Sequence, residues 1–180
     1  MSASMNEEFN KLERQLDDLL QIVRPLSYAQ QNFKPETNSW STLQVFRHMI
    51  QSEGQINLYL RKKILGVKTI GRAGLTAKIR SIILNTAMRL SIKYKVPDAI
   101  KVDFEENYDF EKLSTEWRFL RGEIKSFLEN IDDETSRKEI FRHPVVGRMS
   151  ILQGLSFMNE HLGRHIRQVE RIMLHTEFPK

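Results

Sequence analysis

Apolar residues recur at steps of three and four along most of this chain, and this helical periodicity constrains its fold more than any other feature. The first such stretch covers residues 4–24 and stops at Pro25, which cannot continue a helix. Comparable stretches cover residues 41–65, 75–92, 109–130 and 150–174. The alternation of β-branched residues that is typical of strands is hard to find. We therefore predict an all-α protein.

The lengths of these stretches favour a four-helix bundle with one additional helical segment. Residues 75–92 form the additional segment, and a long crossover at residues 94–103, interrupted by Pro97, follows it. Residues 132–148 are expected to be a loop, since they contain Pro144 and Gly147. No repeat, low-complexity tract or Gly/Ser linker marks a boundary, so residues 1–180 are expected to form a single domain. Trp40 and Trp117 are interpreted as core residues.

The composition limits the chemistry that this chain can perform. It contains no cysteine, so a metal ion must be held by His, Asp or Glu, and any thiol must be supplied from outside. Residues 1–20 lack the apolar core of a signal peptide, and no apolar run approaches the roughly 18 residues of a membrane span. We therefore expect a cytoplasmic protein without a membrane segment.

Two of the five histidines, His161 and His165, are four residues apart in the last predicted helix. This spacing places both imidazoles on one face, where they can reach the same metal ion. At about 100° per residue, both lie at the margin of the apolar stripe. Chance placement on a solvated helix face is the alternative, and a third ligand would decide between the two interpretations.

His48 is the candidate for that third ligand, because it lies at the margin of the apolar stripe of residues 41–65. Three histidines at the edges of two inward stripes can converge where the helices pack. His48 alone could equally be a boundary histidine without a ligand. His143, before a proline in the expected loop, could line the mouth of a site, although a structural role is favoured. His175, near the terminus, is expected to be solvated.

Two blocks of sequence resemble the DinB-like (YfiT-like) family of metalloenzymes. One begins with Asn38-Ser39-Trp40-Ser41 and leads to His48; the other begins with His143-Pro144-Val145-Val146-Gly147-Arg148 and leads to His161, Arg164, His165 and Gln168. The Lys95-Val96-Pro97 crossover also fits this family. The resemblance covers nearly the whole chain. It implies an up-down-down-up bundle and a divalent metal ion bound by His48, His161 and His165.

A centre of three neutral imidazoles suits a divalent transition metal such as zinc or nickel and leaves at least one position open. Leu162 stands where zinc peptidases of the H-E-x-x-H type carry a glutamate, so that chemistry is not expected. Glu160 is predicted to point away from the site. Glu53 could orient an imidazole, but a structural salt bridge is the expected role.

The missing cysteine agrees with a transferase that uses an external low-molecular-weight thiol as cosubstrate, as relatives in this family do with mycothiol or bacillithiol. The expected partner is therefore a small-molecule electrophile. A metal-dependent hydrolase and a non-catalytic, metal-stabilised binding module are the alternatives.

The charge distribution raises the possibility of other partners. Residues 61–101 contain eleven Lys and Arg and one acid, whereas residues 103–139 are acidic. These segments are expected to pair with each other, and nucleic-acid binding is the weaker interpretation because no such motif is present. Apolar residues outside the main stripes suggest a homodimer, which light scattering would test. These residues are Leu65, Val67 and Ile70.

Overall fold

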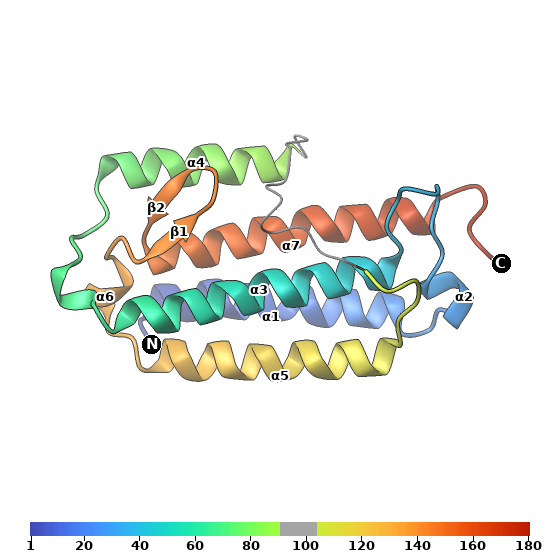
Figure 1. Ribbon diagram of the computed structural model, residues 1–180, viewed down its shortest axis with the longest axis horizontal. Coiled ribbons are helices and arrows are strands. Elements are labelled where there is room, and N and C mark those ends of the chain that lie inside the picture. The colour runs from blue at the N-terminus through green and yellow to red at the C-terminus, as the bar shows by residue number, and fades with distance from the viewer. Residues whose placement is uncertain (91–103) are drawn as a thin grey trace.

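The computed structural model describes residues 1–90 and 104–180, whose helices form an elongated bundle (Figure 1). Four long helices run along it: α1 (Ala3–Val23), α3 (Thr42–Ile64), α5 (Phe110–Glu129) and α7 (Ile151–Met173). The additional helix α4 (Leu75–Arg89) lies between α3 and α5 in sequence. The short elements are α2 (Tyr28–Gln31), η1 (Val67–Thr69), α6 (Asp133–Ser136), β1 (Phe141–His143) and β2 (Gly147–Met149). The predicted bundle with an additional helix is confirmed.

The long helices follow the predicted up-down-down-up order. In Figure 1, α1 and α7 run away from the end that carries the N-terminus, and α3 and α5 run back towards it. Helix α1 packs against α5 and α7, and α3 packs against the same two helices. The bundle therefore places α3 and α7, which carry the candidate histidines, side by side and antiparallel. Helix α4 packs along α7. The predicted crossover at residues 94–103 lies outside the described residues.

Capping boxes fix the start of both histidine-bearing helices. In α3, the Ser41 hydroxyl accepts from the Gln44 backbone N–H, and the Gln44 side chain accepts from the Ser41 N–H. Ser150 and Gln153 form the same pair of bonds at the start of α7. Because these bonds satisfy free N–H groups of the first turn, they set where each helix begins.

A buried ion pair joins α3 to α5 inside the core. The Glu53 and Arg121 side chains are each 1% exposed, and the guanidinium donates from Nε to one carboxylate oxygen at 2.6 Å and from a terminal nitrogen to the other at 2.8 Å. The indole N–H of Trp117, which is fully buried, donates to the same carboxylate at 2.9 Å. The predicted salt bridge of Glu53 and the predicted core position of Trp117 are confirmed.

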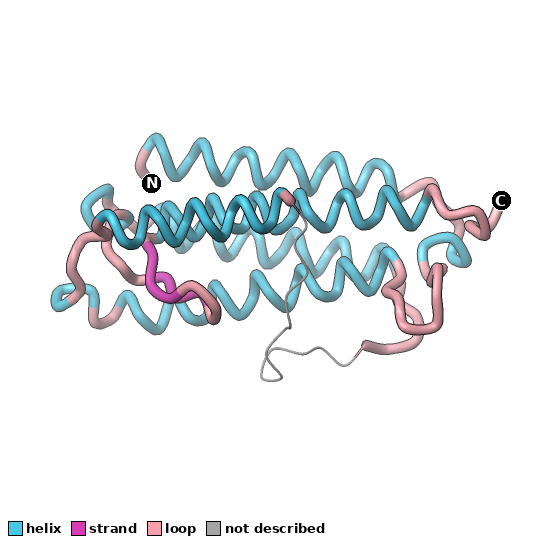
Figure 2. Tube along the Cα trace, turned by 90° about the horizontal axis from the view of Figure 1, so that it is seen from above, coloured by secondary structure: helices cyan, strands magenta, loops and turns pink. Residues whose placement is uncertain are grey.

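The expectation of a loop at residues 132–148 is wrong in part, because this segment contains α6 and an antiparallel hairpin of β1 and β2. Each strand has three residues, which is too short for alternation to be visible in the sequence. Strand β1 contacts α3 and β2 contacts α4, and the hairpin lies alongside these helices (Figure 2). Gly154 of α7 permits this packing, since a Cβ there would lie 3.0 Å from Cγ of Phe141.

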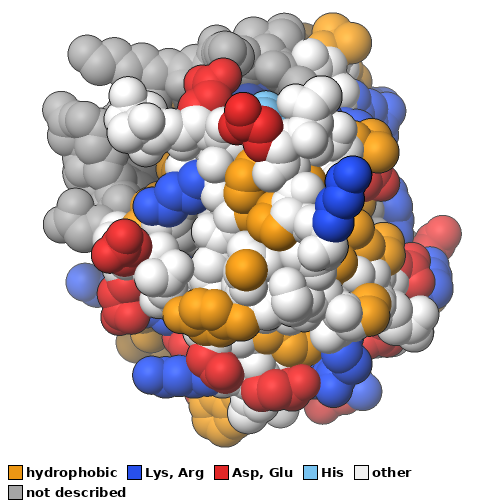
Figure 3. Space-filling model, turned by 90° about the vertical axis from the view of Figure 1, so that its right-hand side faces the viewer, with side chains coloured by type: hydrophobic (Ala, Val, Ile, Leu, Met, Phe, Trp, Pro, Cys, Tyr) orange, Lys and Arg blue, Asp and Glu red, His pale blue; other side chains and the backbone are white. Residues whose placement is uncertain are grey.

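Within residues 1–90 and 104–180, no ion pair joins the basic segment to the acidic segment, contrary to the prediction. Helix α4 packs against α7 and not against the acidic helix α5, and Arg89 forms its ion pair with Glu160 of α7. Glu111 and Glu116 of α5 pair with Arg24 and Arg47, which precede the basic segment. Ion pairing follows the spatial neighbours of each helix. At the end of the bundle shown in Figure 3, charges of both signs are mixed with apolar side chains.

Two further expectations concern the surface of the protein. Leu65 is 88% exposed, but Val67 and Ile70 pack partly against the core, so only part of the suggested dimer surface is open. The homodimer stays a prediction. Within the described parts of the chain, no helix combines the length and apolar character needed to cross a membrane.

Candidate metal centre

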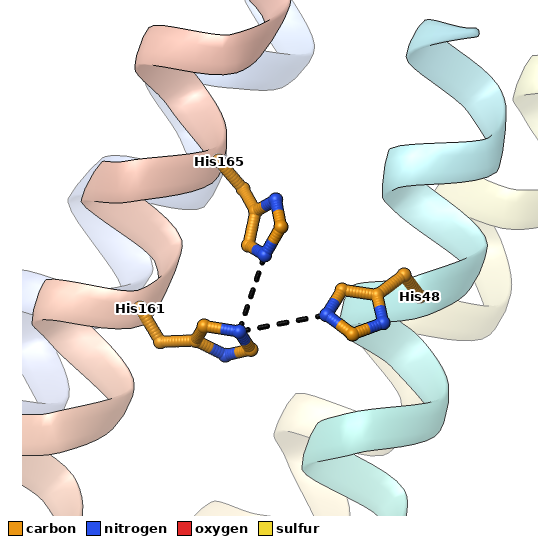
Figure 4. Close-up of side chains that lie close together, drawn as sticks. All are labelled: His48, His161 and His165. Atoms are coloured by element: carbon orange, nitrogen blue, oxygen red, sulfur yellow. Dashed lines mark hydrogen bonds between the residues drawn. The ribbon is translucent and has the colours of Figure 1, made fainter. Parts of the chain in front are cut away.

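Three histidines from two neighbouring helices converge on one point (Figure 4). The Nε2 atom of His161 lies 3.1 Å from Nε2 of His165 and 3.5 Å from Nε2 of His48. His161 and His165 come from successive turns of α7, and His48 faces them from α3. The structure therefore brings together the three residues that the sequence predicted as ligands.

Two of the three separations between these nitrogens match those expected around one metal ion, and all three nitrogens lie within 4.8 Å of one another. Imidazole nitrogens bind zinc at about 2.0–2.1 Å, so two of them at a tetrahedral angle lie about 3.3 Å apart. The two measured separations of 3.1 and 3.5 Å lie on either side of that value. The donor set is all-imidazole, which suits a divalent transition metal. The three side chains could hold one ion with at least one position left for another ligand.

Burial keeps these imidazoles uncharged at neutral pH. It lowers the pKa of His48 to about 4 and that of His165 to about 3. The pKa of His161 is lowered well below 6.5, first by burial and then by repulsion from His165 and His48. Removing a charged imidazole from water is costly, and neighbouring imidazoles would repel it. Neutral rings leave nitrogen lone pairs available for a cation.

Gln168, one turn after His165 on α7, determines which nitrogen of that histidine faces the centre. The Nδ1 atom of His165 lies 2.9 Å from Oε1 of Gln168. An amide oxygen can only accept, so Nδ1 carries the proton and Nε2 presents its lone pair to the other histidines. Gln168 therefore orients the ring and fixes its tautomer, as partners of metal-bound histidines commonly do.

We expect Gln168→Leu to weaken metal binding about 10- to 100-fold, because His165 loses the acceptor that orients it. Competition with a chromophoric chelator would measure this affinity. Gln55→Leu is the matched control, since Gln55 lies beside the same cavity but has no described bond to a ligand histidine. Equal affinities of the two variants would contradict the role of Gln168.

The centre lies in the wall of a cavity of about 650 Å³. The apolar parts of the wall come from Trp40, Ile56, Tyr59, Phe141, Val145 and Phe157. The polar parts include Ser52, Gln55, Arg142, His143, Arg164 and Gln168. Of the described residues around it, none is Asp or Glu. The cavity can therefore hold a small organic molecule next to the histidines, in a wall whose charged side chains are arginines.

Trp40 and His143 also belong to this site. Trp40 was predicted as a core residue, and a place at the mouth of a site was only the alternative for His143. The ring centroid of Trp40 lies 5.0 Å from that of His48 and stacks at 6.1 Å on His165, so this residue covers the histidines while it packs partly against the core. His143 is 6% exposed and lines the cavity, contrary to the structural role that was favoured. Its place in the block that resembles known metalloenzymes was the only indication in the sequence.

The two glutamates near the histidines in sequence are engaged elsewhere. Glu160 points away from the centre, as predicted, and binds Arg89 at 2.7 Å. Glu53 is held by Arg121 and Trp117. His175 lies near the C-terminus against Phe33, with ring centroids 5.8 Å apart, and is not among the cavity residues.

The fold and the site define a helical-bundle protein with a three-histidine centre in the wall of a cavity. The chain belongs to the DinB superfamily, whose family profile matches residues 11–169. It is similar in structure to YfiT from Bacillus subtilis, which is described as a probable metal-dependent hydrolase with an unusual four-helix bundle topology. The likeness has a TM-score of 0.62 at 17% identity and covers 99% of this chain and 91% of that one, which shows a shared fold. No curated protein matches the chain in sequence.

Proposed function

We propose that this protein is a metal-dependent enzyme in which His48, His161 and His165 hold one divalent ion, with zinc and nickel expected first. The observation that carries this proposal is the convergence of three Nε2 atoms in the wall of a cavity large enough for a small molecule. The tautomer set by Gln168 and the neutral state of the imidazoles support it. Cavities with convergent polar groups and histidines of shifted pKa are typical of active sites.

We further propose that the enzyme transfers a small-molecule thiol to an electrophile. A bound divalent ion would stabilise an incoming thiolate or lower the pKa of a bound water molecule. Two observations favour the thiolate. Arg164 of α7 lines the cavity, which suits anionic molecules, and none of the described lining residues is a carboxylate that could serve as a general base for water. Because the chain has no cysteine, the thiol comes from solution.

Hydrolysis is the second candidate function. The similarity of the fold to YfiT, a probable metal-dependent hydrolase, supports it. Water needs no cosubstrate site, and the same cavity would admit an ester. A metal-stabilised binding module without turnover is the remaining alternative.

Elemental analysis of the purified protein, followed by turnover assays with and without metal, would test this proposal. We expect about one ion per chain and metal-dependent transfer of a small thiol to chlorodinitrobenzene or a halogenated bimane, with release of halide. The control uses nitrophenyl acetate without thiol. If the protein cleaves this ester in a metal-dependent way but transfers no thiol, the hydrolase is supported. If metal raises the melting temperature but no substrate turns over, the binding module is supported.

A further inference from the structure

We propose that His143 is a catalytic residue whose Nε2–H donates a hydrogen bond to the substrate oxygen that gains negative charge during the reaction. This inference rests on the proposed function and deepens it. It predicts an electrophile with such an oxygen, as in an epoxide, an ester or an unsaturated carbonyl compound. In each case the thiolate forms a sulfur–carbon bond and an electron pair moves onto the oxygen: from the C–O bond that breaks in an epoxide, from the C=O π bond of an ester, or through the conjugated π bonds of an unsaturated carbonyl compound. The ester oxyanion then reforms its C=O bond and expels the alkoxide. The proton that the thiol released on ionisation returns through solvent to the alkoxide or enolate, while His143 keeps its own proton.

The position of His143 in the hairpin directs its side chain inward. It is the last residue of β1, and the strand alternates between buried Phe141, exposed Arg142 and buried His143. Successive side chains of a strand point to opposite faces, so Phe141 and His143 share the inner face. Both residues line the cavity that contains the three-histidine centre. The hairpin therefore adds a fourth imidazole to the wall of this cavity.

The loop after β1 fixes the tautomer of this imidazole. The backbone N–H of Val145 donates to Nδ1 of His143 at 3.2 Å, and that of Val146 also points to Nδ1 at 3.5 Å. A backbone N–H can only donate, so Nδ1 is the acceptor and the ring proton of the neutral form must be on Nε2. Gly147, at φ 92°, provides the left-handed residue that closes this tight turn.

His143 does not belong to the group of ligand atoms, since only His48, His161 and His165 cluster closely enough among the described residues. Phe157 connects it to the centre. The Phe157 ring stacks on His161 at a centroid distance of 5.3 Å and meets His143 edge-on at 4.8 Å. One aromatic ring thus lies in contact with both histidines. A molecule in the cavity can contact the metal position and His143 together.

The free nitrogen of His143 suits the stabilisation of developing charge. Among the described residues, Nδ1 has the backbone partners of the loop but Nε2 has no hydrogen-bond partner. Burial lowers the pKa of His143 to about 4, so the ring is neutral and has one N–H at physiological pH. A donor that the loop holds in a fixed orientation stabilises an oxyanion more strongly than a freely moving donor in solution, because it need not reorganise during the reaction.

Two substitutions test the hydrogen-bond donor and the hydrogen-bond acceptor of this side chain independently. His143→Asn places an amide oxygen near the position of Nδ1, where it can accept from Val145, but removes the donor at Nε2. His143→Gln places an amide N–H near the position of Nε2. We expect the Asn variant to keep its melting temperature and metal affinity but to lose about 10²–10³-fold in kcat. We expect the Gln variant to recover part of that loss.

Two measurements test this role without turnover. Nitrogen-15 NMR of the wild-type protein should show the Nε2–H tautomer for His143. Calorimetry of the zinc-loaded protein with acetohydroxamate, a probe with metal-binding oxygens, should give about tenfold weaker binding for His143→Asn than for wild type and His143→Gln. A proton on Nδ1, or equal probe affinity of His143→Asn and wild type, would overturn the inference. Failure of wild type to bind zinc would instead contradict the proposed function, and NMR would still decide the tautomer.

Discussion

Replacing His161 by alanine is expected to abolish metal binding and, with it, the metal-dependent part of stability and all turnover. Its Nε2 is the nitrogen closest to both other ligand atoms, so its loss leaves two donors that do not enclose an ion. An ion that binds only the folded state adds about 4 kcal/mol when its free concentration exceeds Kd a thousandfold. For a protein of this size, that corresponds to roughly 10 °C in Tm.

The informative quantity is the difference in Tm with and without a chelator, measured beside the metal content. We expect this difference to be large for wild type and near zero for His161→Ala. His161 is only 7% exposed, so the variant can also lose some packing, and the two metal-free forms should be compared directly. His175→Ala, outside the cavity, is the control. A variant that still contains one ion per chain would show that His161 is not a ligand.

Replacing Glu53 by glutamine is expected to have the largest effect on stability without touching the metal centre. The substitution leaves the Arg121 guanidinium, 1% exposed, with a neutral amide in place of a bidentate carboxylate. Breaking a buried pair from one side costs about 3–5 kcal/mol, because the remaining charge is uncompensated. We therefore expect Tm to fall by roughly 10 °C. Glu13, which also accepts from Arg121, is too exposed to compensate fully.

Glu116→Gln is the matched control for this experiment. It removes a carboxylate of α5 that binds Arg47 at 2.7 Å but is 43% exposed. Because exposed ion pairs contribute little, its Tm should change by about 2 °C or less. Both variants should bind zinc with wild-type affinity. If Glu53→Gln and Glu116→Gln lower Tm by similar amounts, burial does not determine how much the Glu53–Arg121 pair contributes to stability.

The sequence was sufficient to predict the long helices and the three histidines that converge. Residues 41–65 were predicted as a helix that is observed at Thr42–Ile64, and residues 150–174 as one observed at Ile151–Met173. Long amphipathic stretches show many periods, so their type and phase are well determined. The same phase placed His48 and His161 at the edges of two inward stripes. The family resemblance, and not periodicity, predicted which helices are neighbours, because periodicity does not determine the order in which helices pack.

The hairpin and its contribution to the site could not be predicted. Phe141 and His143 face inward through strand pairing and through the space left by Gly154, and both are tertiary features. Pro144 was interpreted as part of a loop, which concealed the turn that holds the imidazole of His143. Trp40 shows the same limit. Its apolar ring predicted a core position; the ring packs partly against the core, and the packing of α7 beside α3 also places it over His48 and His165.

The distribution of the three histidines along the chain has a consequence for how this protein folds and unfolds. His161 and His165 are preorganised by a single helix, whereas His48 is 113 residues away from His161 in sequence. In a chain without cysteine, an ion shared by these residues would act as a removable cross-link. Closing a loop of about 100 residues in this way restricts the unfolded chain by an amount comparable to a disulfide, about 4–5 kcal/mol. An ion taken up early by the pair on α7 would gain its third ligand only when α3 docks, so metal capture would report the assembly of the bundle.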